Sequence, residues 1–85
     1  MRLLNKSTLQ GRMQSYRGLF STKEGKAVLR DLAQFCRAHE STFNPDARTH
    51  ALLEGRREVF LRIQQHLQLN EEQLWLLYGG TELKE

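Results

Sequence analysis

Several residue types that mark particular classes of protein are scarce in this sequence. Cys36 is the one cysteine, so no disulfide can form within the chain, as expected of a protein in a reducing compartment. No apolar run reaches the roughly 18 residues that a transmembrane helix requires. No extended apolar stretch follows Arg2, so we expect no signal peptide. The single proline, Pro45, leaves long stretches of the chain free to form helices.

Motifs for catalysis and metal binding are also missing. The sequence contains no glycine-rich phosphate loop, no nucleophile elbow and no CxxC or HExxH pair. Cys36 with His39, and His50 with Glu54, have the spacing of metal ligands on helices. The first pair, however, lies on an apolar stripe, where a small thiol and a hydrogen-bonded histidine are common. We therefore expect no enzymatic activity, no metal and no cofactor.

The composition is that of an ordinary globular chain, but its charge is unevenly distributed. Of the 85 residues, 39% are hydrophobic and 27% charged, which predicts one domain over residues 1–85. Residues 1–30 carry seven basic side chains and one acidic one, whereas residues 31–85 carry six basic and nine acidic ones. This asymmetry suggests contact with a polyanion or head-to-tail association, and a solvated basic surface is the alternative.

Apolar periodicity and helix-capping residues predict an all-α fold, a small bundle of about four helices. The expected helices cover residues 8–20, 22–39, 45–69 and 71–78, with residues 1–7 as a basic arm and 81–85 as a frayed tail. Ser21, Asn44 and Asn70 are the expected caps of the last three helices. Gly25 would let another backbone come close, and Gly55 predicts a close crossing of helices.

The longest predicted helix, 45–69, carries a broad apolar stripe with an arginine in its middle. At about 100° per residue the stripe contains Leu52, Leu53, Val59, Phe60, Ile63 and Leu67. Arg56 lies among them, and a buried guanidinium without a partner is very costly. We therefore predict a polar pair in the core between Arg56 and Asp31 of the preceding helix. Phe43 is expected to pack under the connecting loop.

Two features of the sequence bear on nucleic acids. Residues 63–78 have the rhythm of a helix-turn-helix motif, but the second helix begins with Glu71 and Glu72, whose charge opposes phosphate. Base-specific recognition by this segment is therefore not expected. Non-specific contact with phosphates remains open for the basic half of the chain. The candidate residues are Arg12, Arg17, Lys23, Lys26, Arg30 and Arg37.

The last predicted helix is apolar almost all round. Trp75 and Leu76 lie off the face formed by the other apolar residues, and Leu61 lies alone on the outer side of the longest helix. Exposed tryptophan and leucine mark binding surfaces, although the first helix could instead cover them. The predicted protein-interaction residues are Leu61, Trp75, Leu76 and Tyr78.

Four stretches of the sequence carry a family resemblance. They are Tyr16-x-x-Leu19-Phe20, Gly25-x-x-Val28-Leu29-x-Asp31-Leu32, Phe43, and the Glu-Gly-Arg-Arg step at 54–57. Together they resemble a family of small tailed-bacteriophage proteins named after a product of a Bordetella podovirus, over about residues 16–78.

The resemblance implies a biological setting. It implies a non-enzymatic structural or assembly protein, a component of the virion or of DNA packaging that docks on a larger phage protein such as a portal or connector. Self-association in a ring fits the same setting, and the expected location is the virion or the host cytoplasm, without a membrane. The alternatives are a nucleic-acid-binding phage protein, genome-associated or regulatory, and an inhibitor of a host protein.

Overall fold

The computed structural model describes residues 5–79, which form four α-helices and no strand. Helix α1 spans Lys6–Phe20, α2 Lys23–Phe35, α3 Ala47–Gln68 and α4 Glu71–Tyr78. The predicted all-α fold is confirmed. The predicted tail at 81–85 and the first four residues of the predicted arm lie outside the described residues.

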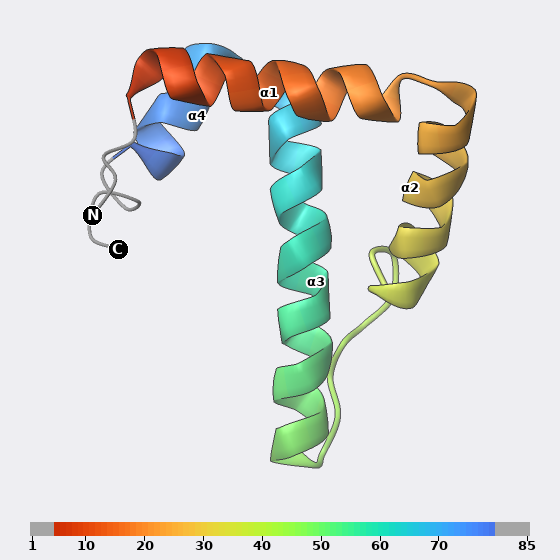
Figure 1. Ribbon diagram of the computed structural model, residues 1–85. Helices are drawn as coiled ribbons and strands as arrows, with labels where there is room; N and C mark the ends of the chain where they lie inside the picture. Colours follow the sequence, from red (N-terminus) through yellow and green to blue (C-terminus); the bar gives the residue numbers. More distant parts are fainter. Residues whose placement is uncertain (1–4, 80–85) are drawn as a thin grey trace.

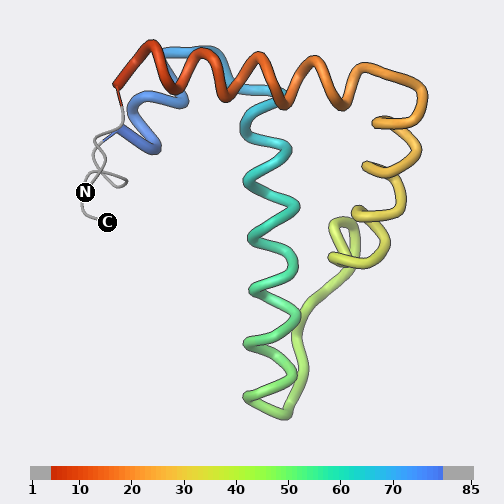
Figure 2. Tube along the Cα trace, viewed as in Figure 1, coloured from red at the N-terminus to blue at the C-terminus, as the bar shows by residue number. Residues whose placement is uncertain are grey.

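The helices are arranged as a T rather than as a parallel bundle (Figure 1). Helix α1 lies across the C-terminal end of α3, and α2 and α4 lie on opposite sides of α3. The connection 36–46 leads from α2 along α3 to the far end of that helix (Figure 2). Because α1 contacts each of the other three helices, it is the element on which the domain is assembled.

Each helix begins directly after a side chain that caps its first turn. The cap oxygen accepts a backbone N–H three residues on, which satisfies a donor that the helix leaves free. The caps are Asn5, Thr22, Asp46 and Asn70, with N···O distances of 2.8, 2.9, 3.0 and 2.8 Å. At α4 the expected capping box is present, since the Gln73 side chain also accepts the N–H of Asn70.

Asp46, the cap of α3, has a lowered pKa. Asp46 accepts the hydroxyl of Thr49 at 2.6 Å and its N–H at 3.0 Å. These bonds, the hydroxyl first, hold the pKa of Asp46 below its ordinary value, because they favour the carboxylate. The resulting stabilisation is therefore present above the pKa of the unfolded chain, and it is lost as the pH falls through the lower pKa of the folded state.

Several predicted helix boundaries were wrong by one to four residues, and α1 begins at Lys6, within the predicted arm 1–7. Thr22 rather than Ser21 caps α2. Asp46 rather than Asn44 caps α3, because the Asn44 side chain accepts the Asp46 N–H in a local turn at 2.9 Å. Helix α2 ends before the predicted limit because Arg37 has a φ of 53°, through which a right-handed helix cannot continue.

The core is narrower than the apolar pattern predicts. One cluster, Leu9, Met13 and Leu74, lies between α1 and α4. The predicted stripe of α3 is buried only in part, since Leu52 and Val59 are exposed. The reason is the T arrangement, in which α1 covers one end of α3 and α2 covers one flank. The buried apolar residues around α3 are Cys36, Leu53, Phe60 and Ile63.

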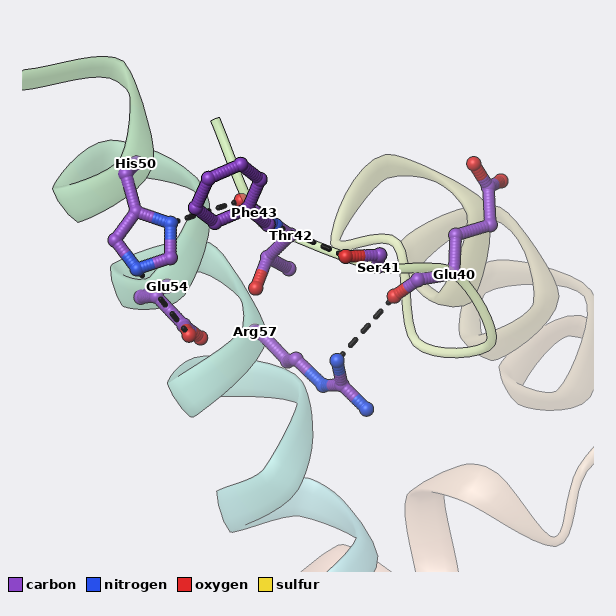
Figure 3. A network of polar contacts seen from close by, with 7 residues as sticks. All are labelled: Glu40, Ser41, Thr42, Phe43, His50, Glu54 and Arg57. Atoms are coloured by element: carbon purple, nitrogen blue, oxygen red, sulfur yellow. Dashed lines mark hydrogen bonds and ion pairs between the residues drawn. The ribbon is translucent and has the colours of Figure 1, made fainter. Parts of the chain in front are cut away.

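The connection before α3 is held by polar contacts from that helix (Figure 3). Arg57 Nη1 donates to the carbonyl of Glu40 at 3.3 Å, and His50 Nδ1 lies 3.2 Å from the carbonyl of Thr42. Phe43 is 73% exposed, with its ring 5.9 Å from that of His50. The expectation that Phe43 packs under the loop was therefore wrong, and contacts from α3 side chains to backbone carbonyls hold the connection instead.

Two glycines that the sequence singles out differ sharply in their surroundings. A Cβ on Gly25 would lie 2.0 Å from the carbonyl oxygen of Leu19 and 2.9 Å from the Cα of Phe20, so the expected close backbone approach is confirmed. A Cβ on Gly55 would meet nothing within 4 Å. The predicted close crossing at Gly55 was therefore wrong, because no neighbouring element approaches it within contact distance.

This difference gives a matched pair of substitutions. Gly25→Ala is expected to lower the free energy of unfolding by about 2 kcal/mol or more, because the turn between α1 and α2 must open. Gly55→Ala should raise it by up to about 1 kcal/mol, because alanine favours the helix and no neighbour opposes it. Urea unfolding followed by circular dichroism measures both, and equal effects would contradict the assigned packing.

Candidate functional site

The junction of α1, α3 and α4 is built around a buried histidine. His66, in the last turn of α3, is 0% exposed. Its ring stacks on that of Tyr16 from α1 at a centroid distance of 4.3 Å, and on that of Tyr78 from α4 at 5.3 Å. Three helices therefore meet on one imidazole.

Hydrogen bonds fix the tautomer of this histidine. Nδ1 lies 2.7 Å from the carbonyl of Arg62, so Nδ1 carries the proton and donates. Nε2 then accepts a hydrogen bond from Nε of Arg12 at 3.0 Å. Both ring nitrogens are satisfied by groups from two helices, as a buried polar side chain requires.

Two predicted DNA-contact residues serve this junction instead. Arg12 is half-buried against His66, and its guanidinium also lies 5.1 Å from the centroid of the Tyr78 ring. Arg17 donates to the carbonyls of His66 at 3.2 Å and of Leu69 at 2.6 Å. These carbonyls end α3, so Arg17 caps the negative end of the helix dipole. Both guanidinium groups are therefore engaged by groups of the domain itself, although Arg17 remains exposed.

The structure separates the four predicted interaction residues. Trp75 is half-buried against the cluster between α1 and α4, with Nζ of Lys6 5.7 Å from its ring centroid. Tyr78 is half-buried against His66, and its hydroxyl donates to Gln65. The prediction that Trp75 lies off the packed face was therefore wrong. Helix α4 packs Trp75 and Leu74 toward α1, and Tyr78 reaches His66 at the end of α3.

The corner between α3 and α4 brings two of these residues together. A groove there is lined from α4 by Leu77 and Tyr78 and from α3 by Gly55, Glu58, Val59, Leu61, Arg62 and Gln65. Leu61 is 49% exposed and Leu77 42%. Sequence reasoning missed Leu77, because helical periodicity places it on the same broad face as Leu74, which is fully buried. Leu76 is 79% exposed and lies outside the groove.

The predicted Arg56–Asp31 pair does not form. The guanidinium carbon of Arg56 lies 4.5 Å from the centroid of the Phe35 ring, and Arg56 is half-buried there. Asp31 is exposed, and among residues 5–79 no ion pair joins it to Arg56. The stripe of α2 turns Phe35, not Asp31, toward Arg56, and an aromatic face accepts the cation.

The remaining basic candidates lie on the outside of α2. Lys23, Lys26 and Arg30 are exposed and fall on one face of the helix, the face opposite Val28 and Phe35. No ion pair within the described part of the chain involves them. Arg37 is also exposed, beyond the end of α2.

The two pairs of candidate metal ligands do not form a common site. Cys36 is buried, and His50 and Glu54 pair with each other, with 3.8 Å between Nε2 and Oε1. Over residues 5–79 no group of three His, Cys, Asp or Glu side chains gathers at one place. Nor does any helix in this range combine the length and the apolar character needed to cross a membrane.

The fold and these surfaces define a small all-α protein with apolar and basic patches on its exterior. The profile of the Bbp19-like phage protein family matches residues 16–77, from the second half of α1 into α4. The chain therefore belongs to this family, which confirms the resemblance noted from the sequence, and it is a phage protein. Comparison with curated proteins and with solved structures gave no match.

Replacing the histidine tests whether the junction holds the domain together. His66→Ala is expected to lower the free energy of unfolding by about 3 kcal/mol, because it leaves a cavity between two tyrosines and removes the acceptor of Arg12. His39→Ala is the control, since His39 is exposed, and it should change little. Equal urea midpoints for the two variants would show that the stack contributes no stability.

Proposed function

We propose that this chain is a non-enzymatic structural or assembly protein of the phage, a component of the virion or of the packaging machinery. In this proposal it docks on a larger phage protein such as a portal or connector. The proposal follows from the family membership together with the apolar groove between α3 and α4.

The groove has the composition of a protein-binding site. Leu61 and Leu77 supply apolar lining from two helices, and Glu58, Arg62 and Gln65 supply polar lining. Apolar side chains together with hydrogen-bonding groups are the usual composition of a protein interface. Repeated copies that also contact one another on a symmetric partner would strengthen the binding, because each bound copy then raises the effective concentration of the next.

Substitutions in the groove test the docking site. Leu61→Asp and Leu77→Asp are expected to abolish capture of the portal or connector protein, because each places a charge in the apolar lining. Leu76→Asp makes the same change on the same helix as Leu77, but outside the groove, and should leave capture intact. Capture by all three variants, each shown to be folded by circular dichroism, would contradict docking through this groove.

The copy number per particle tests the wider proposal. Quantitative mass spectrometry of purified virions, or of packaging intermediates, should find this protein in a fixed ratio to the portal or connector. Its absence from both would contradict a structural role. That result would favour the regulatory or host-directed alternatives.

The exposed basic face of α2 favours a second candidate, non-specific DNA binding. Lys23, Lys26 and Arg30 lie on one side of the helix, and no carboxylate in residues 5–79 pairs with them. Cations in this arrangement hold phosphates without reading sequence. Arg12 and Arg17 add little to this surface, because their guanidinium groups serve the His66 junction.

The salt dependence of binding tests this candidate. The wild-type protein should bind arbitrary duplex DNA with log Kobs falling against log salt with a slope of about −3, about −0.9 for each of three phosphate contacts. The variant Lys23→Gln/Lys26→Gln/Arg30→Gln should lose this binding, whereas Arg48→Gln, an exposed change on α3, should not. DNA binding that persists in the triple variant would exclude α2 as the contact surface.

A further inference from the structure

The helices around the His66 junction are joined by contacts of two chemical kinds. Helices α1 and α4 meet through the apolar cluster of Leu9, Met13 and Leu74, against which Trp75 packs. The C-terminal end of α3 is joined to both of them by polar and aromatic contacts around the His66 ring. Protonation leaves an apolar contact unchanged, but it breaks a hydrogen bond in which the titrating atom accepts. The two kinds of contact therefore respond differently to acid.

His66 makes these contacts only as a neutral imidazole. Its Nδ1 donates to the carbonyl of Arg62 at 2.7 Å, and its Nε2 accepts from Nε of Arg12 at 3.0 Å. A proton on Nε2 would occupy the lone pair that accepts this bond, so two donors would face each other. Arginine cannot relieve the conflict, because its guanidinium does not lose its proton in proteins. Protonation of His66 therefore breaks this link between α1 and α3.

The surroundings of the ring also oppose an added positive charge. From residues 5–79, the charged and titratable side chains that contact the ring, its backbone or its partners include Arg12, Tyr16 and Arg17 of α1, Arg62 of α3 and Tyr78 of α4. The carbonyls at the end of α3 would attract a cation, but Arg17 already donates to two of them. Because His66 is buried, water does not solvate the charge.

The docking groove between α3 and α4 depends on the same ring. Tyr78 lines the groove and stacks on His66 at a centroid distance of 5.3 Å. Its hydroxyl donates to Gln65, which also lines the groove. Between α3 and α4 the chain has two residues, Leu69 and Asn70, and Arg17 donates to the carbonyl of Leu69 at 2.6 Å. A change at His66 therefore reaches both walls of the groove.

We infer that protonation of His66 detaches the α1–α4 pair from the end of α3 and thereby opens the docking groove. The apolar cluster keeps α1 and α4 together, so the movement takes place at the connection 69–70. The groove has its binding shape while His66 is neutral and loses it when His66 is charged. Control of docking rests on the proposed function, whereas detachment of the helices does not.

The direction of the pH dependence follows from proton linkage. A histidine in an unfolded chain takes up its proton at about pH 6.5, whereas the closed junction excludes that proton. The closed state is therefore fully favoured above this pH, and its stability is lost as the pH falls below it. For one excluded proton, the equilibrium constant for closing falls about ten-fold for each pH unit.

Nuclear magnetic resonance of the wild-type protein tests detachment without any partner. The nitrogen shifts of His66 should show the neutral tautomer protonated at Nδ1 at about pH 7.5. On acidification the ring should become charged only as its contacts with Tyr16 and Tyr78 disappear, while the contact between Leu9 and Leu74 persists. The exposed His39 is the internal reference. A ring that becomes charged with both tyrosine contacts intact, or that stays neutral with them intact at about pH 4, would overturn the inference.

Urea unfolding across the same pH range measures the excluded proton. The substitution His66→Gln supplies an amide that can accept from Arg12 and donate to the Arg62 carbonyl but does not titrate. Relative to this variant, the wild-type folding constant should fall about ten-fold per pH unit below about pH 6.5. His39→Gln should keep the wild-type dependence. Identical pH profiles for wild type and His66→Gln would overturn the inference, and the resonance titration decides alone if His66→Gln does not fold.

Binding at two pH values separates the control of docking from docking itself. Between about pH 7.5 and about pH 4 the wild-type protein should lose at least about three-fold more affinity for the portal or connector protein than His66→Gln does, because only the closed fraction binds. Equal losses would overturn the control of the groove by His66. Absence of binding at about pH 7.5 would contradict the proposed docking, and the resonance and urea measurements would still decide whether the helices detach.

Discussion

Burial of one imidazole between two tyrosines decides how this chain folds. His66 can be buried only if both of its nitrogens are satisfied, and the carbonyl of Arg62 and the guanidinium of Arg12 satisfy them. Because Arg12 and Tyr16 both belong to α1, this helix must cross α3 at its C-terminal end. Tyr78 then brings α4 to the other side of the ring. The T arrangement follows from these contacts rather than from a continuous apolar seam.

This arrangement determines which surfaces stay open. A helix that crosses the end of α3 cannot cover its length, so Leu52 and Val59 remain exposed although they belong to an apolar stripe. The same junction engages the guanidinium groups of Arg12 and Arg17, so among residues 5–79 the exposed cations of the N-terminal half without such a contact lie mainly on α2. The apolar faces and the reduced basic face therefore have one structural cause. It is the use of polar groups, rather than apolar area, to join α1 to α3.

Local features of this fold could be predicted from the sequence, and non-local ones could not. The helices, the Asn70 capping box and the close approach at Gly25 depend on residues within a few positions of each other. The Arg56–Asp31 pairing failed because it required the relative rotation of α2 and α3, which periodicity does not give. His66 was missed because its partner Arg12 lies 54 positions away in the chain. Its position beside the Ile63–Leu67 stripe was the signal that could have found it.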